Sequence, residues 1–336
     1  LDTPGVVIAS LRERLAAQPA FFEPILGRLL GEKPGAFADL NTALFEDGAL
    51  VEILPQALVS EPLQLLFLST GAAVARLPRV LVLARPGSEA TLVETYAGSG
   101  SAASFTDVVT EILVEENAVL RRYKLQNEAA GAFHLSALGV RVGRNGRFHD
   151  FSVSLGAALS RHDLKVALVA EGAEASLDGL FFADGERHTD THTVIDHIEP
   201  HGTSRQTYKG IVGGRGRGVF TGRVIVRKGA QKTDAAQSNK NLLLSREALV
   251  HSTPQLEILA DDVKCRHGAT TGQLDEAAIF YLRSRGLSEA AARGLLTVAF
   301  AADLVQKIAV PALRERVSAQ LLARLPGVAE APEAAL

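Results

Sequence analysis

A short segment near residue 265 holds the residue types best suited to metal or thiol chemistry. It reads Lys264-Cys265-Arg266-His267-Gly268 and contains the one cysteine of the chain. In an extended segment, Cys265 and His267 would face the same side, about 7 Å apart. We expect the positive charges of Lys264 and Arg266 to favour the thiolate, the form that binds metal or attacks as a nucleophile. A small buried cysteine is the alternative interpretation, and no local signature of a thiol protease surrounds the residue.

A second group of candidate ligands lies between residues 188 and 201. This run contains two carboxylates and four imidazoles, groups that suit zinc: Asp190, Asp196, His188, His192, His197 and His201. If the run is extended, His188, Asp190 and His192 share one side, whereas His197 and His201 point to the other. The pattern favours a ladder of hydrogen-bonded polar side chains, with a metal site as the alternative.

A glycine-rich run from Gly213 to Gly218 has the composition of a phosphate-binding loop. No Lys-Ser or Lys-Thr pair follows it, and the next segment is predicted to be a strand. A phosphate loop needs a helix at that position, because the helix N-terminus supplies the anion site. We therefore expect a tight turn between strands, and no ATP hydrolysis by this chain alone.

The elements that position these segments fall into four zones. They are an N-terminal helical segment, a core of strands, a C-terminal helical domain and a disordered tail, at residues 1–47, 48–272, 273–327 and 328–336. The core is a long series of short strands separated by Gly, Asn or Asp turns. It fits a large sandwich, two barrels or a coil that winds in one direction. Weak internal similarity favours the coil, although Asn145-Gly146 could mark a hairpin.

Several residues predict where the helices begin. Ser10 has capping-box spacing to a glutamate three residues later, and a short helical pattern runs from Phe37 to Phe45. Near the other end, Asp275 and Ser288 are predicted N-caps, and Pro311 suits the first turn of a third helix.

Composition excludes several classes of protein. The net charge is −3 and the pI about 6.3, which argues against a nucleic-acid-binding protein. One cysteine excludes a disulfide scaffold and favours a reducing, cytoplasmic compartment. The most apolar stretch, Gly294 to Val310, carries Asp303 and Lys307, so we expect a buried helix and no membrane span. Leu1 is not a natural start, and we expect the natural chain to begin earlier.

The segment from Pro254 to Gly286 makes the sequence resemble a known family. Its motifs are Pro254-Gln255-Leu256-Glu257-Ile258, Asp261-Asp262-Val263-Lys264-Cys265-Arg266-His267-Gly268-Ala269-Thr270, Gly272-Gln273-Leu274-Asp275-Glu276 and Phe280-Tyr281-Leu282-Arg283-Ser284-Arg285-Gly286. Similar motifs lie upstream, among them Tyr123-Lys124-Leu125-Gln126 and Ser204-Arg205 with Tyr208-Lys209-Gly210. These residues closely resemble the SufD family of the SufB/SufD superfamily, over about residues 5–310. The Asp-Asp-Val-Lys-Cys-x-His-Gly-Ala-Thr form points to SufD over its paralogue SufB.

The resemblance implies a mainly β fold, a right-handed parallel β-helix flanked by N-terminal and C-terminal helical segments. It also implies a cytosolic scaffold with SufB and the ATPase SufC, on which iron–sulfur clusters are built. The last strands of the β-helix would pair with SufB, with Cys265 and His267 at that surface and the histidine holding the nascent cluster. The C-terminal helical region would dock SufC, and the docking residues expected there are Asp275, Glu276, Phe280, Tyr281, Leu282 and Arg283.

Ligand counting agrees with a shared site. A cluster is usually held by four ligands, mostly thiolates, so one cysteine is too few. We expect no cofactor in the isolated chain, a transient cluster in the complex, and no catalytic activity of the chain itself. The isolated chain could form a homodimer through the strands that otherwise pair with SufB. Two alternatives are a β-helix enzyme and a homodimeric metal-binding protein that uses the His188–His201 cluster.

Overall fold

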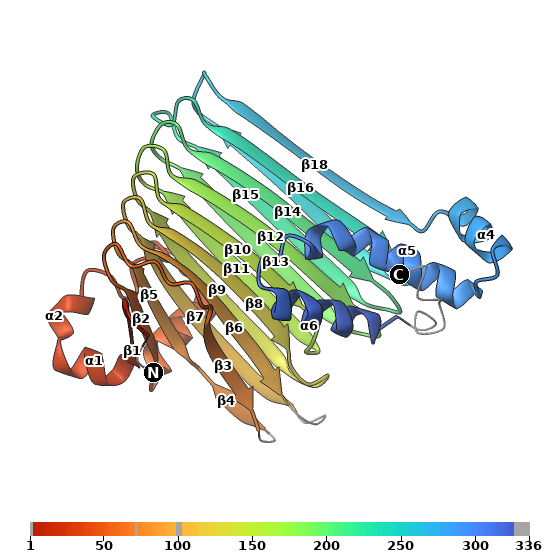
Figure 1. Cartoon of the computed structure of the whole chain (residues 1–336), viewed down its shortest axis with the longest axis horizontal. Coiled ribbons are helices and arrows are strands. Elements are labelled where there is room, and N and C mark those ends of the chain that lie inside the picture. Colours follow the sequence, from red (N-terminus) through yellow and green to blue (C-terminus); the bar gives the residue numbers. More distant parts are fainter. Residues whose placement is uncertain (1–2, 71–72, 99–102, 326–336) are drawn as a thin grey trace.

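The chain winds into a coil with two walls of parallel strands (Figure 1). The computed structural model describes residues 3–70, 73–98 and 103–325. Within these residues, sheet A has ten strands and sheet B has eight. Successive strands of the chain alternate between the two sheets over most of the coil. The mainly β fold and the parallel β-helix predicted from the sequence are confirmed.

The bounds of the elements are as follows. Sheet A contains β1 (Val6–Ser10), β2 (Gly48–Ile53), β4 (Val74–Arg76), β5 (Arg79–Ala84), β7 (Ser104–Val114), β9 (Phe133–Val142), β11 (Leu159–Leu168), β13 (His188–His197), β15 (Arg217–Val226) and β17 (Leu249–Ile258). Sheet B contains β3 (Leu63–Ser69), β6 (Glu89–Gly98), β8 (Val119–Asn127), β10 (Arg147–Ser154), β12 (Glu174–Ala183), β14 (Thr203–Val212), β16 (Asp234–Leu243) and β18 (Lys264–Gln273). The helices are α1 (Leu11–Ala17), α2 (Pro19–Phe22), α3 (Ala36–Leu44), α4 (Glu276–Ser284), α5 (Glu289–Val305) and α6 (Pro311–Leu322).

Each turn of the coil stacks on the next in strict register. From β6 onward in sheet B, a residue faces one 27 to 31 positions further along, as Arg147 faces Glu174 and Thr203 faces Asp234. Neighbouring turns also bond to one another: the backbone N–H of Asn145, a residue with a φ of +52°, donates to the carbonyl of Glu171 in the next coil. Asn145-Gly146 therefore lies at a turn of the coil, and not in the hairpin that the pair could have marked.

The glycine-rich run is a turn between parallel strands, as predicted. Val212 ends β14 and Arg217 begins β15, so no helix follows the glycines. A Cβ on Gly214 would lie 2.9 Å from the backbone nitrogen of Gly185 in the preceding coil, and Gly214 has a φ of +59°. Close stacking of the turns accounts for the glycine at this position.

The N-terminal segment differs from its mainly helical prediction at one element. Val6–Ser10 forms β1, which pairs antiparallel with β2. The caps agree with the sequence: Ser10 Oγ accepts a hydrogen bond of 3.2 Å from the backbone N–H of Glu13, and α1 begins at the next residue. The helix predicted between Phe37 and Phe45 is α3.

The interior of the coil combines an apolar core with buried polar residues, and it contains an ionic network between β6 and β10. Arg122 donates two hydrogen bonds to Glu94, at 2.7 and 2.8 Å, and one of 2.6 Å to Asp150. These three residues come from β8, β6 and β10, which are neighbouring strands of sheet B. Asp150 is directly opposite Arg122 in the register, whereas Glu94 is opposite Lys124, two positions along. Burial alone would raise the pKa of Glu94, but the charge and hydrogen bonds of Arg122 lower it below its usual value.

A second polar group lies beside this triad. Lys124 donates a hydrogen bond of 2.5 Å to Ser136 Oγ, which also shares one of 2.7 Å with His162 Nδ1. Burial and the nearby Arg122 lower the pKa of Lys124 to about 7. The middle of the coil is therefore held together by charged and polar contacts as well as by apolar packing.

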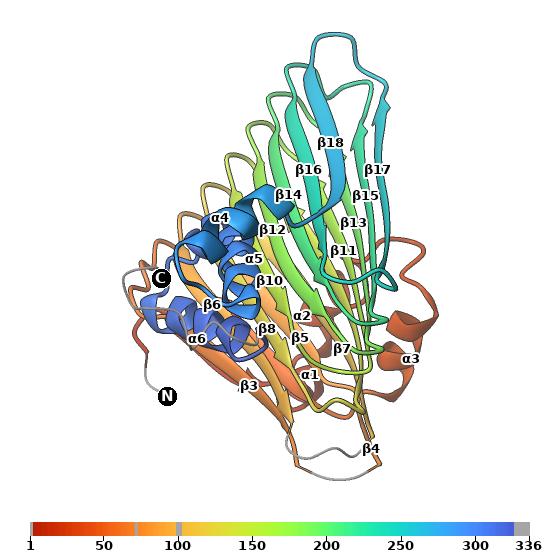
Figure 2. The same ribbon diagram turned by 90° about the vertical axis from the view of Figure 1, so that its right-hand side faces the viewer.

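Helices α5 and α6 cover the outer face of sheet B (Figures 1 and 2). Their apolar side chains pack on outward-facing residues of the sheet such as Phe151, Leu180 and Ile211. Polar ties fix them there: Lys209 Nζ donates to the carbonyl of Phe300 at 2.7 Å, and the N–H of Ala309 donates to Tyr123 Oη at 3.0 Å. In the part of the chain that the structure describes, no helix is both long enough and apolar enough to cross a bilayer.

The predicted C-terminal helix starts agree with the structure. Asp275 and Ser288 are the N-caps of α4 and α5, and Pro311 is the first residue of α6. The tail predicted to be disordered, residues 328–336, lies outside the described residues.

Candidate functional site

The C-terminal end of the coil is open. β18 is the last strand of sheet B and pairs with β16, and β17 is the last strand of sheet A and pairs with β15. Among the described strands none pairs with the far edge of either. Figure 2 shows both strands at the end of the stack, beyond the reach of the helices on sheet B. Two parallel edges with free backbone groups are therefore presented side by side.

Cys265 and His267 lie on β18, the edge strand of sheet B. Cys265 faces Ala235 and His267 faces Gln237 on β16, and both of these β16 residues point into the coil. The two residues are two positions apart in a strand, so they share its inner side, as the sequence predicted. Cys265 is half-buried and packs against the apolar core, whereas His267 is exposed. The imidazole therefore lies at the open end of the coil.

The expectation that positive neighbours favour the Cys265 thiolate is wrong. Burial raises the pKa of the Cys265 thiol above its usual value; the Asp234 carboxylate adds to the rise, and a hydrogen bond with the Ala235 backbone opposes it. Lys264 and Arg266 have little influence because consecutive side chains of a strand point to opposite faces. In this chain the thiol is protonated at neutral pH, a state that favours neither metal binding nor nucleophilic attack.

Four of the six residues expected to dock a partner stabilise the C-terminal helices. Asp275 Oδ1 accepts a hydrogen bond of 2.9 Å from the N–H of Ala277 and so caps α4. Glu276 and Arg283 form ion pairs with Arg293 and Glu289 on α5, at 3.2 and 3.7 Å. Leu282 is the fourth of these residues, and its side chain is half-buried.

The other two, Phe280 and Tyr281, are exposed aromatic residues of α4. The exposed fraction is 74% for Phe280 and 57% for Tyr281. Arg285 lies over the Tyr281 ring, 5.2 Å from its centre, while Ile279 on the opposite side of the helix is buried. Figure 1 shows α4 projecting from the end of the coil, apart from the sheet-bound α6. The aromatic pair is therefore available for contact with another protein.

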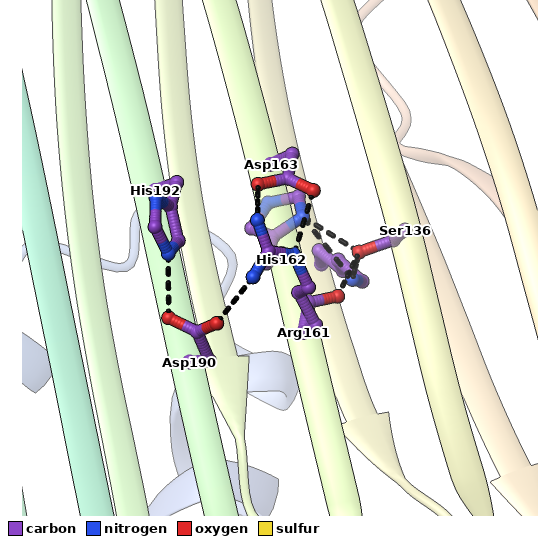
Figure 3. Close-up of polar contacts among 7 residues, drawn as sticks. Ser136, Arg161, His162, Asp163, Asp190 and His192 are labelled. Atoms are coloured by element: carbon purple, nitrogen blue, oxygen red, sulfur yellow. Dashed lines mark hydrogen bonds and ion pairs between the residues drawn. The ribbon is translucent and has the colours of Figure 1, made fainter. Parts of the chain in front are cut away.

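Two outward residues of the histidine run, Asp190 and His192, belong to an ion-pair ladder (Figure 3). Arg161 on β11 makes two hydrogen bonds to Asp163, at 2.9 and 3.0 Å, and one of 2.6 Å to Asp190 on β13. Asp190 in turn contacts His192 Nε2 at 2.8 Å. The Arg161 guanidinium lies between the Asp163 and Asp190 carboxylates, where a metal ion would otherwise have to bind. The polar ladder predicted from the sequence is confirmed.

The inward and turn histidines do not join this ladder. His197 is buried inside the coil, where its Nε2 shares a hydrogen bond of 2.8 Å with Ser204 Oγ, and burial lowers its pKa to about 4. His201 is exposed in a turn and does not lie on the inner side with His197, because the strand ends at His197. Within residues 3–70, 73–98 and 103–325, no three His, Cys, Asp or Glu side chains are arranged to hold a metal ion. The metal-binding alternative therefore has no geometric support.

Sequence reasoning missed the buried ionic network. The only signal for it is a charged residue at an inward position of an otherwise apolar strand, as with Glu94 in β6. The neighbours Arg121 and Arg122 are equivalent in the sequence, yet Arg121 is partly exposed and pairs with Glu89, whereas Arg122 is buried. Only the strand register distinguishes them.

Comparison with known proteins gives the same picture as the fold. The profile described as "SUF system FeS cluster assembly, SufBD core domain" matches residues 67–300. The iron–sulfur cluster assembly SufBD family protein slr0076 of Synechocystis is 34% identical over 329 residues, which cover 94% of this chain and 72% of that protein.

Two further relatives are matched over a smaller part of their length. The iron–sulfur cluster assembly protein SufD of Escherichia coli is 37% identical over 72% of this chain and 57% of its own length. The protein ABCI7, chloroplastic, of Arabidopsis thaliana is 35% identical over 71% of this chain and 51% of its own length. The chain thus spans little more than half of these two relatives. On the family profile and these identities, the chain belongs to the SufBD family of iron–sulfur cluster assembly proteins and is SufD-like.

Proposed function

We propose that this chain is a scaffold subunit of the SUF machinery that has no catalytic activity of its own and works in the cytoplasm. It pairs with SufB through β17 and β18, docks the ATPase SufC through its C-terminal helices, and helps to hold a nascent cluster at the SufB interface. The cluster is the cargo of the assembly, and the isolated chain carries no resident cofactor. The observation that carries the proposal is the open end of the coil, where the exposed His267 lies on an edge strand.

The geometry supports a shared site at this edge. An added strand can bond to the free backbone groups of β18 and would lie beside the inner side of the strand, where His267 and Cys265 are. One imidazole and one protonated thiol are too few for a cluster, so the partner must supply most of the ligands. Approach of a partner or of iron can displace the thiol proton, and His267 is then the first ligand of this chain to be engaged.

Docking of SufC is assigned to the exposed aromatic pair of α4. Phe280 and Tyr281 offer large apolar area at a site where Asp275 and Glu276 fix the helix by its cap and its ion pair. Exposed aromatic anchors of this kind commonly contribute most of the binding energy of an interface. α5 and α6 are fixed to sheet B, so movement of a partner bound at α4 would be transmitted to the end of the coil.

The test is reconstitution of the complex with SufB and SufC, followed by iron and acid-labile sulfide analysis. His267→Ala should lower cluster content severalfold and leave the complex intact by size-exclusion chromatography. The matched control is His251→Ala, an exposed histidine on the adjacent edge strand β17, which should give the cluster content of the unaltered chain. Equal cluster content in the two variants would remove His267 from the site.

The same preparation separates docking from cluster binding. Phe280→Ala should lose SufC while SufB stays bound. Without SufB, the unaltered chain should form a homodimer through β17 and β18, measured by light scattering. A monomer that still binds SufB would contradict the shared-edge part of the proposal.

A further inference from the structure

The outer face of the last three strands of sheet B carries an excess of positive charge. The face belongs to β14, β16 and β18, which contain one acidic residue, Asp234. Their basic residues besides histidine are Arg205, Lys209, Lys240, Lys264 and Arg266. All of them, and Asp234, lie at outward positions, because the alternating residues of β14 and β16 are buried inside the coil. On a chain of net charge −3, this face is locally cationic.

Asp234 neutralises only part of the face, because within the described part of the chain it forms an ion pair with Arg205 alone. Its carboxylate accepts a hydrogen bond of 2.6 Å from Arg205, and its pKa is held below the usual value by this bond and by the nearby charges of Arg205, Arg266 and Lys264. One carboxylate therefore lies among three cations. Lys209 is tied to Asp303 of α5, so it does not contribute a free charge.

A hollow of about 350 Å³ lies in the middle of this face. Its floor is the β16 pair Ala236 and Ser238, and its sides are Arg205 and Thr207 on β14 and Arg266 and Gly268 on β18. Small residues on the middle strand between long arginines on both neighbours produce the depression. Gly268 has no side chain to close its side of the hollow, and the space beside it is open, since a Cβ there would meet no atom within 4 Å.

The lining is suited to an anion. Arg205 already donates to the Asp234 carboxylate and to the carbonyls of Ser204 and Asp234, so Arg266 is the main charge-assisted donor and Arg205 adds its remaining N–H groups. The hydroxyls of Thr207 and Ser238 can donate as well. No carboxylate lines the hollow. His267 borders the hollow, but its side chain is on the inner side of β18, whereas the hollow opens on the outer face. The hollow and the imidazole are therefore on opposite faces of the same edge strand.

We propose that this hollow is a binding site for a small anion, formed by Arg205 and Arg266 over Ala236 and Ser238. Two sources share this chemistry, hydrosulfide and inorganic phosphate. Hydrosulfide is the one that the position on the partner-facing edge strand favours, because the site would then hold anionic sulfur on the outer face of β18, across the strand from His267 and the nascent cluster. That role rests on the proposed function, whereas the binding of an anion does not.

The test is a titration of the isolated, ¹⁵N-labelled chain, monitored by amide NMR shifts. Sodium hydrosulfide, without oxygen, and sodium phosphate are added in separate arms at constant ionic strength, because surface electrostatics are screened by salt. The amides of Ser238 and Gly268 should shift and saturate, and hydrosulfide should saturate them at the lower concentration. Saturation by phosphate alone would overturn the sulfur role, and no saturation by either would overturn the site.

Three variants make the assignment specific. Arg266→Gln should weaken binding about tenfold, in line with the loss of one charge-assisted hydrogen bond. Ser238→Leu keeps every charge but fills the hollow, and should abolish the saturable shift. Arg223→Gln is the control, because Arg223 is an exposed arginine of β15 that pairs with Glu257 outside this face. An equal effect of Arg223→Gln and Arg266→Gln would reduce the site to general surface charge and overturn it.

The anion site and the cluster role of His267 are tested by different measurements, so either can fail without the other. Normal cluster content in His267→Ala, together with saturable hydrosulfide binding, would remove the cluster role and leave the anion site. Lowered cluster content in His267→Ala without any anion binding would do the reverse.

Discussion

The interior of the coil changes character between its middle and its end. Around β6, β8 and β10 it contains full charges, with Arg122 bonded to Glu94 below and Asp150 above. Around β14 and β16 the inward polar groups are amides, hydroxyls and an imidazole whose pKa burial lowers to about 4. Among them, Gln237 Nε2 donates to Gln206 Oε1 at 2.6 Å, and Gln206 Nε2 donates to Thr193 Oγ1 at 2.6 Å.

The position in the stack explains the difference. A buried charge is tolerated only when oppositely charged and hydrogen-bonding partners surround it, and Arg122 finds these partners on the turns before and after its own. The last turn has a neighbouring turn on one side only. Neutral amides near that end lose less free energy than a charge when a partner is absent. The edge that binds a partner protein therefore has no buried charge that depends on a further turn.

The largest expected loss of stability comes from a substitution in the charged middle of the coil. Arg122→Ala should lower the free energy of unfolding by about 3–5 kcal/mol, because Glu94 and Asp150 are left buried without a cation. The measurement is urea unfolding. Arg121→Ala is the matched control: its partly exposed pair with Glu89 should contribute at most about 1 kcal/mol. Similar losses in both variants would mean that burial of Arg122 has no energetic consequence.

An intermediate effect concerns pH. The pKa of Lys124 is lowered to about 7 by burial and by Arg122, below its value of 10.5 in the unfolded chain. Between these values the unfolded chain binds the proton more tightly, so stability should rise with pH from about 7 to 10, by up to about 1.4 kcal/mol per pH unit.

Lys124→Met should flatten this part of the stability profile, measured by urea unfolding at several pH values. An unchanged slope in the variant would assign the pH dependence to other groups. Gln206→Leu, in the uncharged part of the interior, should leave the slope as it is in the unaltered chain.

The smallest effect belongs to the amide ladder near the end. Gln237→Leu removes one hydrogen bond between neutral groups and should lower the free energy of unfolding by about 0.5–1.5 kcal/mol. Thermal and urea unfolding both measure it. A loss as large as that of Arg122→Ala would erase the proposed contrast between the middle and the end of the coil.

Much of the fold was predictable, because it rests on local signals. Ser10, Asp275 and Ser288 are side-chain caps whose hydrogen bonds reach two or three residues along the chain, and turn residues separate the strands. β1 was not predicted, since its five residues pair with a strand about forty positions away. Contacts at that distance leave no periodic pattern in a short segment.

The candidate site was predictable only in part. The motif around residue 265 and alternation along a strand were enough to place Cys265 and His267 on one side. The state of the thiol was predicted wrongly, because charge was counted along the chain although Lys264 and Arg266 point to the other face. The anion hollow combines residues from three strands that lie about thirty positions apart, so it becomes visible only once the coils are stacked.

The strict register makes every turn of the coil structurally equivalent to the next. Adding or removing one whole turn of about thirty residues would lengthen or shorten the body by about 4.8 Å and leave both ends chemically unchanged. Half a turn would instead transfer the terminal strand to the opposite wall and carry His267 away from its edge. Length changes compatible with assembly at this end must therefore come in complete windings.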